Sequence, residues 1–164
     1  GKSYLTVDEN GKMVRSKVVS VRNGEVVPGG KGKMDDTGTR VPLIANWPGR
    51  IEAGSEVDDL ADLTDLMPTL LEIAGIEPAE NLDGVSLAPV LLGKPEQGAS
   101  RDWIYLEHRG RRCLRSRRAK LYWDGRFFDL AGDPLEKKAL SPETLSGNLR
   151  EEYEKLETIR ETEF

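Results

Sequence analysis

A lysine enclosed by glycines is the part of the sequence best suited to binding an anion. In Gly29-Gly30-Lys31-Gly32 the glycines let backbone amides approach a ligand closely, and Lys31 adds a point charge. Together these features suit a tetrahedral oxyanion. The segment is not a Walker A loop, because Gly32 stands where that loop requires Ser or Thr. Taken alone, such a segment is more often a flexible turn, so the role of Lys31 depends on its surroundings.

His108 is the single histidine of the chain and therefore its one candidate imidazole. It lies between Glu107 and Arg109, and its ring can donate a hydrogen bond to an anionic group of a substrate. A histidine without an orienting partner is more often a surface residue. We keep His108 as a second candidate for contact with substrate, after Lys31.

Acidic residues cluster at two places in the sequence. Asp35-Asp36 could ligate a hard cation, although adjacent carboxylates on a strand point apart and are more often a solvated turn. Asp58-Asp59 and Asp62 lie near a predicted helix start, where we interpret them as complementing the helix dipole. The sequence therefore assigns no metal ligand.

A basic run surrounds the single cysteine, Cys113; its members are Arg109, Arg111, Arg112, Arg115, Arg117, Arg118 and Lys120. Alternate residues of a strand point to opposite faces, so no single surface collects all these charges. We expect a solvated, ion-paired face rather than an anion-binding patch. Cys113 is predicted to be a small, half-buried strand residue. As a lone cysteine it excludes an internal disulfide and a cysteine-based zinc site.

The composition is typical of a soluble globular protein. Of the 164 residues, 37% are hydrophobic and 32% are charged, and the mean hydropathy is -0.52. The net charge of -5 gives no broad positive surface for nucleic acid. No apolar run approaches the ~20 residues that span a bilayer, and no signal peptide opens the chain. The chain begins at Gly1 without Met, which we interpret as a fragment or a processed chain.

The first hundred residues predict a few elements joined by loops. After an extended arm, Lys17–Arg22 and Glu25–Val27 flank Asn23-Gly24, a strong hairpin signal. The run 41–47 is apolar on both parities and predicts a strand buried on both faces, as in a parallel sheet. A helix is predicted over 62–75, capped by Thr64 or Asp65 and closed by Gly75, and a short helical turn over 87–92. The apolar face of that longer helix comprises Leu66, Leu70, Ile73 and Ala74.

The last third predicts a small antiparallel sheet covered by a helix. Four β-like runs occupy 103–107, 112–117, 121–123 and 126–130, with Asp124-Gly125 as a tight turn between the last two. A terminal helix follows, with Ser141 as N-cap and Pro142 at the first helical position. Its apolar face comprises Leu145, Leu149, Tyr153, Leu156 and Ile159.

The order of these motifs resembles the sulfatase family. The glycine-lysine segment is followed by Gly38-Thr39-Arg40-Val41-Pro42-Leu43-Ile44 and Trp47-Pro48-Gly49, and then by Asp65–Leu71, Ala74-Gly75-Ile76, Leu82–Leu87 and Leu91-Leu92-Gly93. Near the end, Arg112–Lys120, Phe128-Asp129-Leu130 and Asp133–Lys137 match the closing sheet of the family. The resemblance covers about residues 29 to 140, and the terminal helix is compatible with it.

The resemblance implies an α/β fold: the C-terminal part of an alkaline-phosphatase-like sulfatase fold, with a small antiparallel sheet packed by a terminal helix. Residues 1–100 would end the α/β sulfatase domain, and residues 101–164 would form the antiparallel subdomain. Sulfatases hydrolyse sulfate esters with a calcium-assisted formylglycine nucleophile, and the Gly-Lys-Gly lysine reaches the sulfate. The matching residue is Lys31, the predicted catalytic residue.

The nucleophile motif, paired metal aspartates and catalytic histidines of sulfatases belong to a larger N-terminal part that this sequence lacks. Cys113 is not the formylglycine precursor, because Arg115 stands where the Cys-x-Pro-x-Arg sequence has Pro or Ala. The metal-binding Asp-Asn-Gly turn of the family is matched by Asp8-Glu9-Asn10-Gly11 with an extra Glu, or Gly1 is its last residue. No metal ligand is carried over, and the chain alone is predicted to be inactive.

The resemblance implies a sulfate ester as substrate, the N-terminal catalytic part of the same enzyme as partner, and a periplasmic or secreted location. Two other functions remain open. One is a phosphonate or phosphate monoester hydrolase of the same fold, since sulfate and phosphate are both tetrahedral oxyanions. The other is a non-catalytic accessory or binding module.

Overall fold

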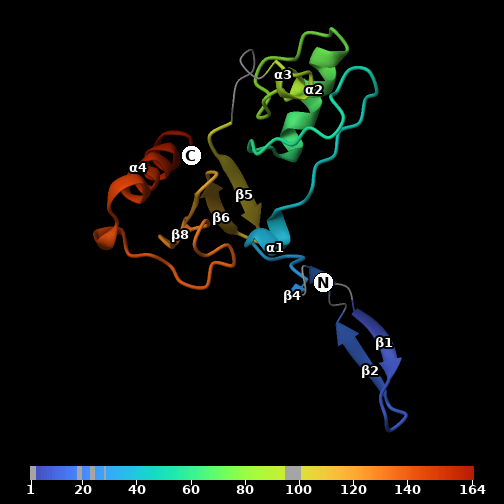
Figure 1. Cartoon of the computed structure of the whole chain (residues 1–164). Helices are drawn as coiled ribbons and strands as arrows, with labels where there is room; N and C mark the ends of the chain where they lie inside the picture. The colour runs from blue at the N-terminus through green and yellow to red at the C-terminus, as the bar shows by residue number, and fades with distance from the viewer. Residues whose placement is uncertain (1–2, 18–19, 23–24, 28, 95–100) are drawn as a thin grey trace.

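The computed structural model describes residues 3–17, 20–22, 25–27, 29–94 and 101–164. An N-terminal hairpin extends away from the rest of the molecule (Figure 1). A four-stranded sheet with a terminal helix contains most of the buried residues. None of the helices in these ranges is both long and apolar enough to cross a bilayer.

Two hairpins begin the chain. Strands β1 (Ser3–Val7) and β2 (Met13–Lys17) pair antiparallel, as do β3 (Ser20–Arg22) and β4 (Glu25–Val27). The predicted hairpin is confirmed in its strands, although Lys17 belongs to β2, and the Asn23-Gly24 turn lies outside the described residues. The β1–β2 hairpin was not predicted; its turn is closed by the Asp8 carboxylate, which accepts hydrogen bonds from the amides of Asn10 and Lys12.

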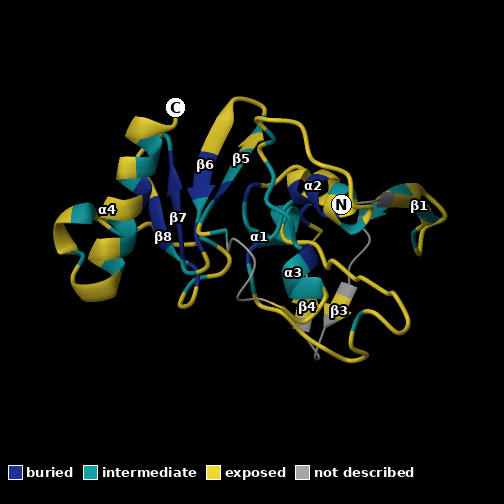
Figure 2. Cartoon of the chain, turned by 90° about the horizontal axis from the view of Figure 1, so that it is seen from above, coloured by how far each residue is buried: buried dark blue, intermediate teal, exposed yellow. Residues whose placement is uncertain are grey.

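The predicted antiparallel sheet is confirmed. It consists of β5 (Ile104–His108), β6 (Arg111–Arg115), β7 (Ala119–Tyr122) and β8 (Phe127–Asp129), in that order. Burial is concentrated in β6, β7 and β8 (Figure 2). The Asp124-Gly125 turn joins β7 to β8, with Gly125 at φ +86°, a conformation that suits glycine.

Side chains alternate between the two faces of this sheet and form two cores. On one face, Leu114, Leu121 and Phe127 pack against Leu156 of helix α4 (Gly147–Thr162). On the opposite face, a second cluster comprises Met34, Cys113, Tyr122, Phe128 and Leu130. Met34 comes from far upstream, so residues just after the glycine-lysine segment complete the second core.

The terminal helix begins later than predicted. Ser141 and Pro142 start a short 3-10 helix (Pro142–Thr144), and the chain is extended at Leu145 before α4 begins after Ser146. The single helix predicted from Ser141 is therefore wrong at its start. The predicted apolar face is confirmed, because all five of its residues belong to the core on the α4 side of the sheet.

The predicted buried strand over 41–47 is wrong for this structure. Residues 41–47 form no strand, and all of them are exposed, Ile44 to 86%. A strand apolar on both faces needs partner strands and covering helices, and the described residues place neither beside it. The segment runs along the surface as an apolar, unpaired chain.

The predicted helix over 62–75 divides into a 3-10 turn (Leu63–Asp65) and α2 (Leu66–Ile73), followed by Gly75 at φ +69° as predicted. Asp65, one of the two predicted caps, is the N-cap residue of α2, although its side chain makes no cap hydrogen bond there. Asp62 caps the preceding 3-10 turn and accepts from the Thr64 amide. The predicted apolar face is largely uncovered, with Leu70 65% exposed. The predicted helical turn over 87–92 is α3 (Ala88–Leu91).

Candidate functional site

The glycine-lysine segment opens a compact loop, residues 30–39, which we call the lysine loop. The Lys33 amide donates to the Gly30 carbonyl at 2.8 Å, and Asp35 caps the single-turn helix α1 (Asp36–Thr39) that ends the loop. A Cβ on Gly30 would overlap the backbone of Thr37, and one on Gly38 would overlap the carbonyls of Gly30 and Lys33. The glycines therefore allow a close crossing of the two ends of the loop.

Polar contacts and the side chain of Met34 attach the lysine loop to the sheet. The guanidinium of Arg115 lies 3.1 Å from the Asp36 carboxylate, and Arg111 donates to the Gly32 carbonyl at 3.0 Å. Met34 is buried against Cys113 and its neighbours. In Figure 1, α1 lies next to β5 and β6. The loop is thus held at several points along its length.

The structure brings together the two residues that the sequence analysis selected. A Cβ on Gly32 would lie 3.5 Å from Nε2 of His108, so the imidazole faces the residue next to Lys31. Nε2 is buried and lacks a hydrogen-bond partner among the described residues. Lys31 is exposed and forms no ion pair with a described carboxylate. A solvent-facing ammonium and an unsatisfied imidazole nitrogen therefore share one edge of the molecule.

A third lysine lies beneath the loop. Lys120 of β7 is fully buried, and its Nζ lies 2.7 Å from the Met34 carbonyl, 2.5 Å from Oε1 of Glu136 and 3.7 Å from Oδ1 of Asp36. The hydroxyl of Tyr122 donates to the other oxygen of Glu136. Burial and this hydrogen bond raise the pKa of Tyr122. The network joins the loop, the sheet and the segment after β8.

The acidic pairs act as caps and ion-pair partners. Asp35 accepts from the Thr37 amide, while Asp36 pairs with Arg115. Asp59 pairs with Arg117, and Asp62 caps the turn before α2. In the described ranges, no three His, Cys, Asp or Glu side chains form a group arranged to hold a metal ion.

The basic run has the predicted ion-paired character. Arg112 lies 3.5 Å from Glu107, Arg118 lies 3.5 Å from Asp129, and Arg115 and Arg117 pair with the aspartates named above. Cys113 is fully buried rather than half-buried, and burial raises the pKa of its thiol to about 12. Its position in the core fits the packing role predicted for it.

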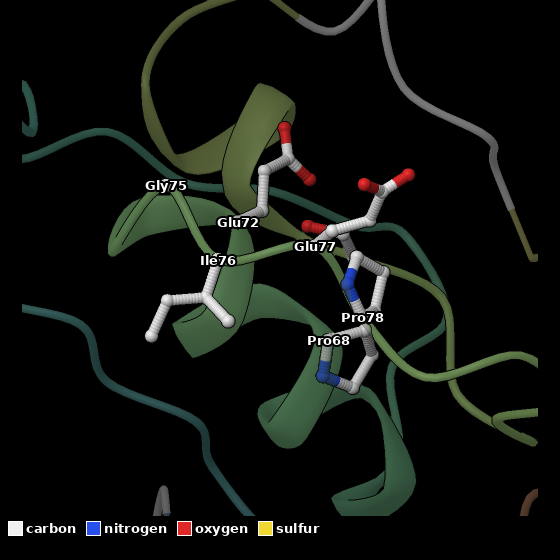
Figure 3. Close-up of a pocket in the computed structure, with 7 residues that line it drawn as sticks. Pro68, Glu72, Gly75, Ile76, Glu77 and Pro78 are labelled. Atoms are coloured by element: carbon white, nitrogen blue, oxygen red, sulfur yellow. The ribbon is translucent and has the colours of Figure 1, made fainter.

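A depression of about 440 Å³ lies at the C-terminal end of α2, away from the lysine loop in sequence. It is lined by Pro68, Glu72, Gly75, Ile76, Glu77, Pro78 and Ser86. The carboxylates of Glu72 and Glu77 lie on the same side of it (Figure 3). Two carboxylates without a lining cation do not suit an anionic ligand, so this depression is not the candidate site.

Comparison with known proteins decides the family. The model for the C-terminal region of N-sulphoglucosamine sulphohydrolase matches residues 30–162. The chain belongs to the sulfatase family. The match begins at Gly30 and therefore includes the lysine loop, the sheet and all of α4. The α/β fold, with its antiparallel sheet and terminal helix, is that of the C-terminal portion of a sulfatase.

Individual sulfatases match shorter stretches. An ulvan-active sulfatase from Formosa agariphila is 45% identical over 65 residues, which are 40% of this chain and 13% of that protein. Arylsulfatase A from Bos taurus is 48% identical over 65 residues, 39% of this chain and 13% of that protein. A solved structure of a 2-O GAG sulfatase is 29% identical, with a TM-score of 0.46, and covers 60% of this chain and 24% of that one. The sulfatase chain matches only a small part of each relative.

Sequence reasoning did not find Lys120, Glu136 or Arg111 as parts of the site. One signal was available for Lys120: in β7 it has the same parity as Tyr122, a residue of the core face. A lysine at such a position needs a buried carboxylate partner. Glu136 lies 16 residues further along, so no local pattern identifies it as that partner.

Proposed function

We propose that this chain is the C-terminal part of an enzyme that hydrolyses an organic sulfate ester to sulfate and an alcohol or phenol. The observation that carries the proposal is the exposed Lys31 on a tightly held loop, within a segment that matches a sulfatase family model. The fixed position of the loop suits a residue that must meet a charge developing at one point.

Lys31 would bind a sulfate oxygen and offset the negative charge that develops on the leaving ester oxygen. A preorganised cation of this kind stabilises the transition state more than the ground state. His108, whose Nε2 is buried against Gly32, would contact an anionic group of the same substrate through its other ring nitrogen, Nδ1. Both residues lie on the edge formed by the lysine loop and the β5–β6 hairpin.

Calcium and formylglycine, the groups that assist sulfatases, do not fit the residues described here. The carboxylates of Asp8, Asp35 and Asp36 already cap turns or pair with cations, and Cys113 is sealed in the core. We propose that a further part of the same enzyme supplies both groups.

The same proposal accounts for the exposed apolar surface of residues 1–100. Ile44 and Leu70 would be covered when residues 41–47 and α2 join the α/β domain of the enzyme. Residues 101–164 would form the antiparallel subdomain. The chain alone would then lack both a nucleophile and the rest of the substrate site.

The test compares two lysines of one loop in the complete enzyme. Lys31→Ala should lower kcat by about 10²-fold or more, the scale of removing a preorganised donor to a transition state. Lys33→Ala is the matched control. Lys33 is an exposed lysine of the same loop, but its Nζ already lies 3.8 Å from a carboxylate oxygen of Asp35. The 164-residue chain serves as the blank and should show no turnover of an aryl sulfate.

Equal, small losses for the two variants would show that the glycine-lysine segment is an ordinary turn. Faster turnover of a phosphate ester than of the matching sulfate ester would instead favour a phosphoryl-transfer enzyme of the same fold.

A further inference from the structure

The ammonium of Lys120 is placed where it can control the position of the lysine loop. Its side chain has no exposed surface, and its nearest acceptors are the Met34 carbonyl and the Glu136 carboxylate, at 2.7 and 2.5 Å. Asp36, at 3.7 Å, also belongs to the loop. One cation of the sheet therefore contacts the loop three and five residues after Lys31.

Glu136 is held in place on the other side of that cation. Its carboxylate, only 6% exposed, accepts from Lys120 with one oxygen and from the Tyr122 hydroxyl with the other. Its backbone adopts φ +53°, an uncommon conformation for a residue with a side chain. A strained backbone that persists is over-determined by its surroundings, here by the two hydrogen bonds to its carboxylate.

Stability alone does not account well for this arrangement. Buried ion pairs recover their desolvation cost only with excellent geometry, and an apolar residue often replaces them without loss. Phe128, the partner of Lys120 on β8, belongs to an apolar core that a methionine would extend. The hydrogen bond from Lys120 to the Met34 carbonyl is directional, whereas apolar packing is not. It can therefore fix the distance and the orientation of the loop relative to the sheet.

We infer that Lys120 and Glu136 are positioning residues for Lys31. They hold the lysine loop on β7 so that the Lys31 ammonium occupies one place at the edge of the sheet. This inference rests on the proposed function, in which Lys31 contacts the sulfate group. A displacement of a catalytic group by about 1 Å is expected to cost on the order of 10²-fold in rate.

A double-mutant cycle in the complete enzyme tests the inference. Lys120→Met keeps the unbranched side chain up to the ε position and removes the ammonium; it should lower kcat by about 10- to 100-fold, with a smaller change in KM. In the Lys31→Ala background the same change should cost less than about twofold, because residues that act as a unit are not additive. Lys137→Met, at an exposed position next to Glu136, is the matched control and should leave kcat unchanged.

The cycle distinguishes a failure of the role proposed for Lys31 from a failure of the role inferred for Lys120. If Lys31→Ala leaves kcat intact, the proposed role of Lys31 fails. If Lys31→Ala lowers kcat but Lys120→Met costs the same factor in both backgrounds, or nothing, then Lys120 does not act through Lys31 and the inference is overturned.

Hydrogen exchange on the 164-residue chain provides a readout that is independent of activity. The reporters are the hydrogen-bonded amides of Lys33, Gly38 and Thr39 in the loop. Lys120→Met should accelerate their exchange about tenfold or more, while the β6–β7 amides keep their protection. If Lys120→Met does not fold, Glu136→Gln, which preserves shape and an acceptor oxygen, should give a smaller acceleration of the same amides. Unchanged loop exchange in a folded variant would overturn the inference.

Discussion

The buried thiol of Cys113 makes the free energy of unfolding depend on pH in the alkaline range. Burial raises the pKa of this thiol to about 12 in the folded chain, against about 8.5 in an unfolded one. Below pH ~8.5 both states hold the proton, and the stabilising contribution is complete. Above that pH the unfolded chain releases its proton first, so the contribution declines until the pH passes the folded pKa.

We therefore expect the free energy of unfolding to fall as the pH rises above about 9. The thiol can contribute up to about 1.4 kcal/mol per pH unit, and the raised pKa of Tyr122 acts in the same direction. Urea unfolding at a series of pH values measures this effect. Cys113→Ala provides the control, because its stability deficit relative to the original chain should shrink as the pH rises. A deficit that is constant from pH 8 to 11 would contradict the prediction.

At the residue scale the sequence identified Lys31 and His108 as candidate site residues but not the fully buried Lys120. Lys31 was recognisable because its neighbours are glycines, and His108 because it is the only imidazole. Their proximity was not predictable, since it depends on how the β5–β6 hairpin meets a loop about 75 residues upstream. Lys120 was placed among surface charges, because a run of seven cations conceals the one that faces the core.

The elements around α2 are joined by one buried carboxylate. Asp65 is fully buried; it accepts from the amides of Asp62 and Val85, both at 2.8 Å, and pairs with Arg101. Asp65 thus joins the start of α2 to Val85, which precedes α3, and to Arg101, which precedes β5. Removing Asp65 leaves Arg101, whose side chain is 10% exposed, with only Asp62, at 4.0 Å, as a described carboxylate partner.

Asp65→Asn should therefore destabilise the α2–α3 region strongly, by about 3 kcal/mol. The exposed Asp58 is the matched control, and Asp58→Asn should change stability by less than about 0.5 kcal/mol. Hydrogen exchange at Val85 and through α2 in the complete enzyme, where the rest of the α/β domain would cover α2, follows the region directly. Similar exchange in the two variants would mean that the Asp65–Arg101 pair contributes little.

After residue 60 the element types were predictable from the sequence, whereas their limits were not. Period-two patterns and turn dipeptides located β5 to β8, and the apolar spacing identified the buried face of α4. The start of α4 was misplaced because Ser141-Pro142 is a good N-terminal signal for a 3-10 turn as well as for an α-helix. The run 41–47 has the composition of a buried strand, but a strand forms only where a partner offers hydrogen bonds.

At the scale of the molecule, order is distributed unevenly. The sheet has α4 on one face and the lysine loop on the other, whereas residues 41–57 carry exposed apolar side chains such as Val41, Ile44 and Val57. Each large apolar side chain left in water loses about 1.5–3 kcal/mol of stabilisation from burial. Residues 41–57 therefore have little to hold them in one conformation.

We expect hydrogen exchange of the isolated chain to be fast across 41–74 and slow across 103–130 and in α4. The first half is also expected to be loose or self-associating, so exchange is measured over a range of protein concentrations. Uniform strong protection in a monomer would mean that the chain completes its own core, which would favour an independent binding module over part of an enzyme.

The burial of Met34 in the sheet core also determines what happens to the molecule when its backbone is cut. Met34, Asp36 and Gly32 contact β6 and β7 across more than 70 residues of intervening sequence. A protease that cleaves the exposed segment after Arg50 therefore severs the chain without separating its parts. The two pieces should elute together under native conditions and part only in denaturant, a split protein whose halves recognise each other through the lysine loop.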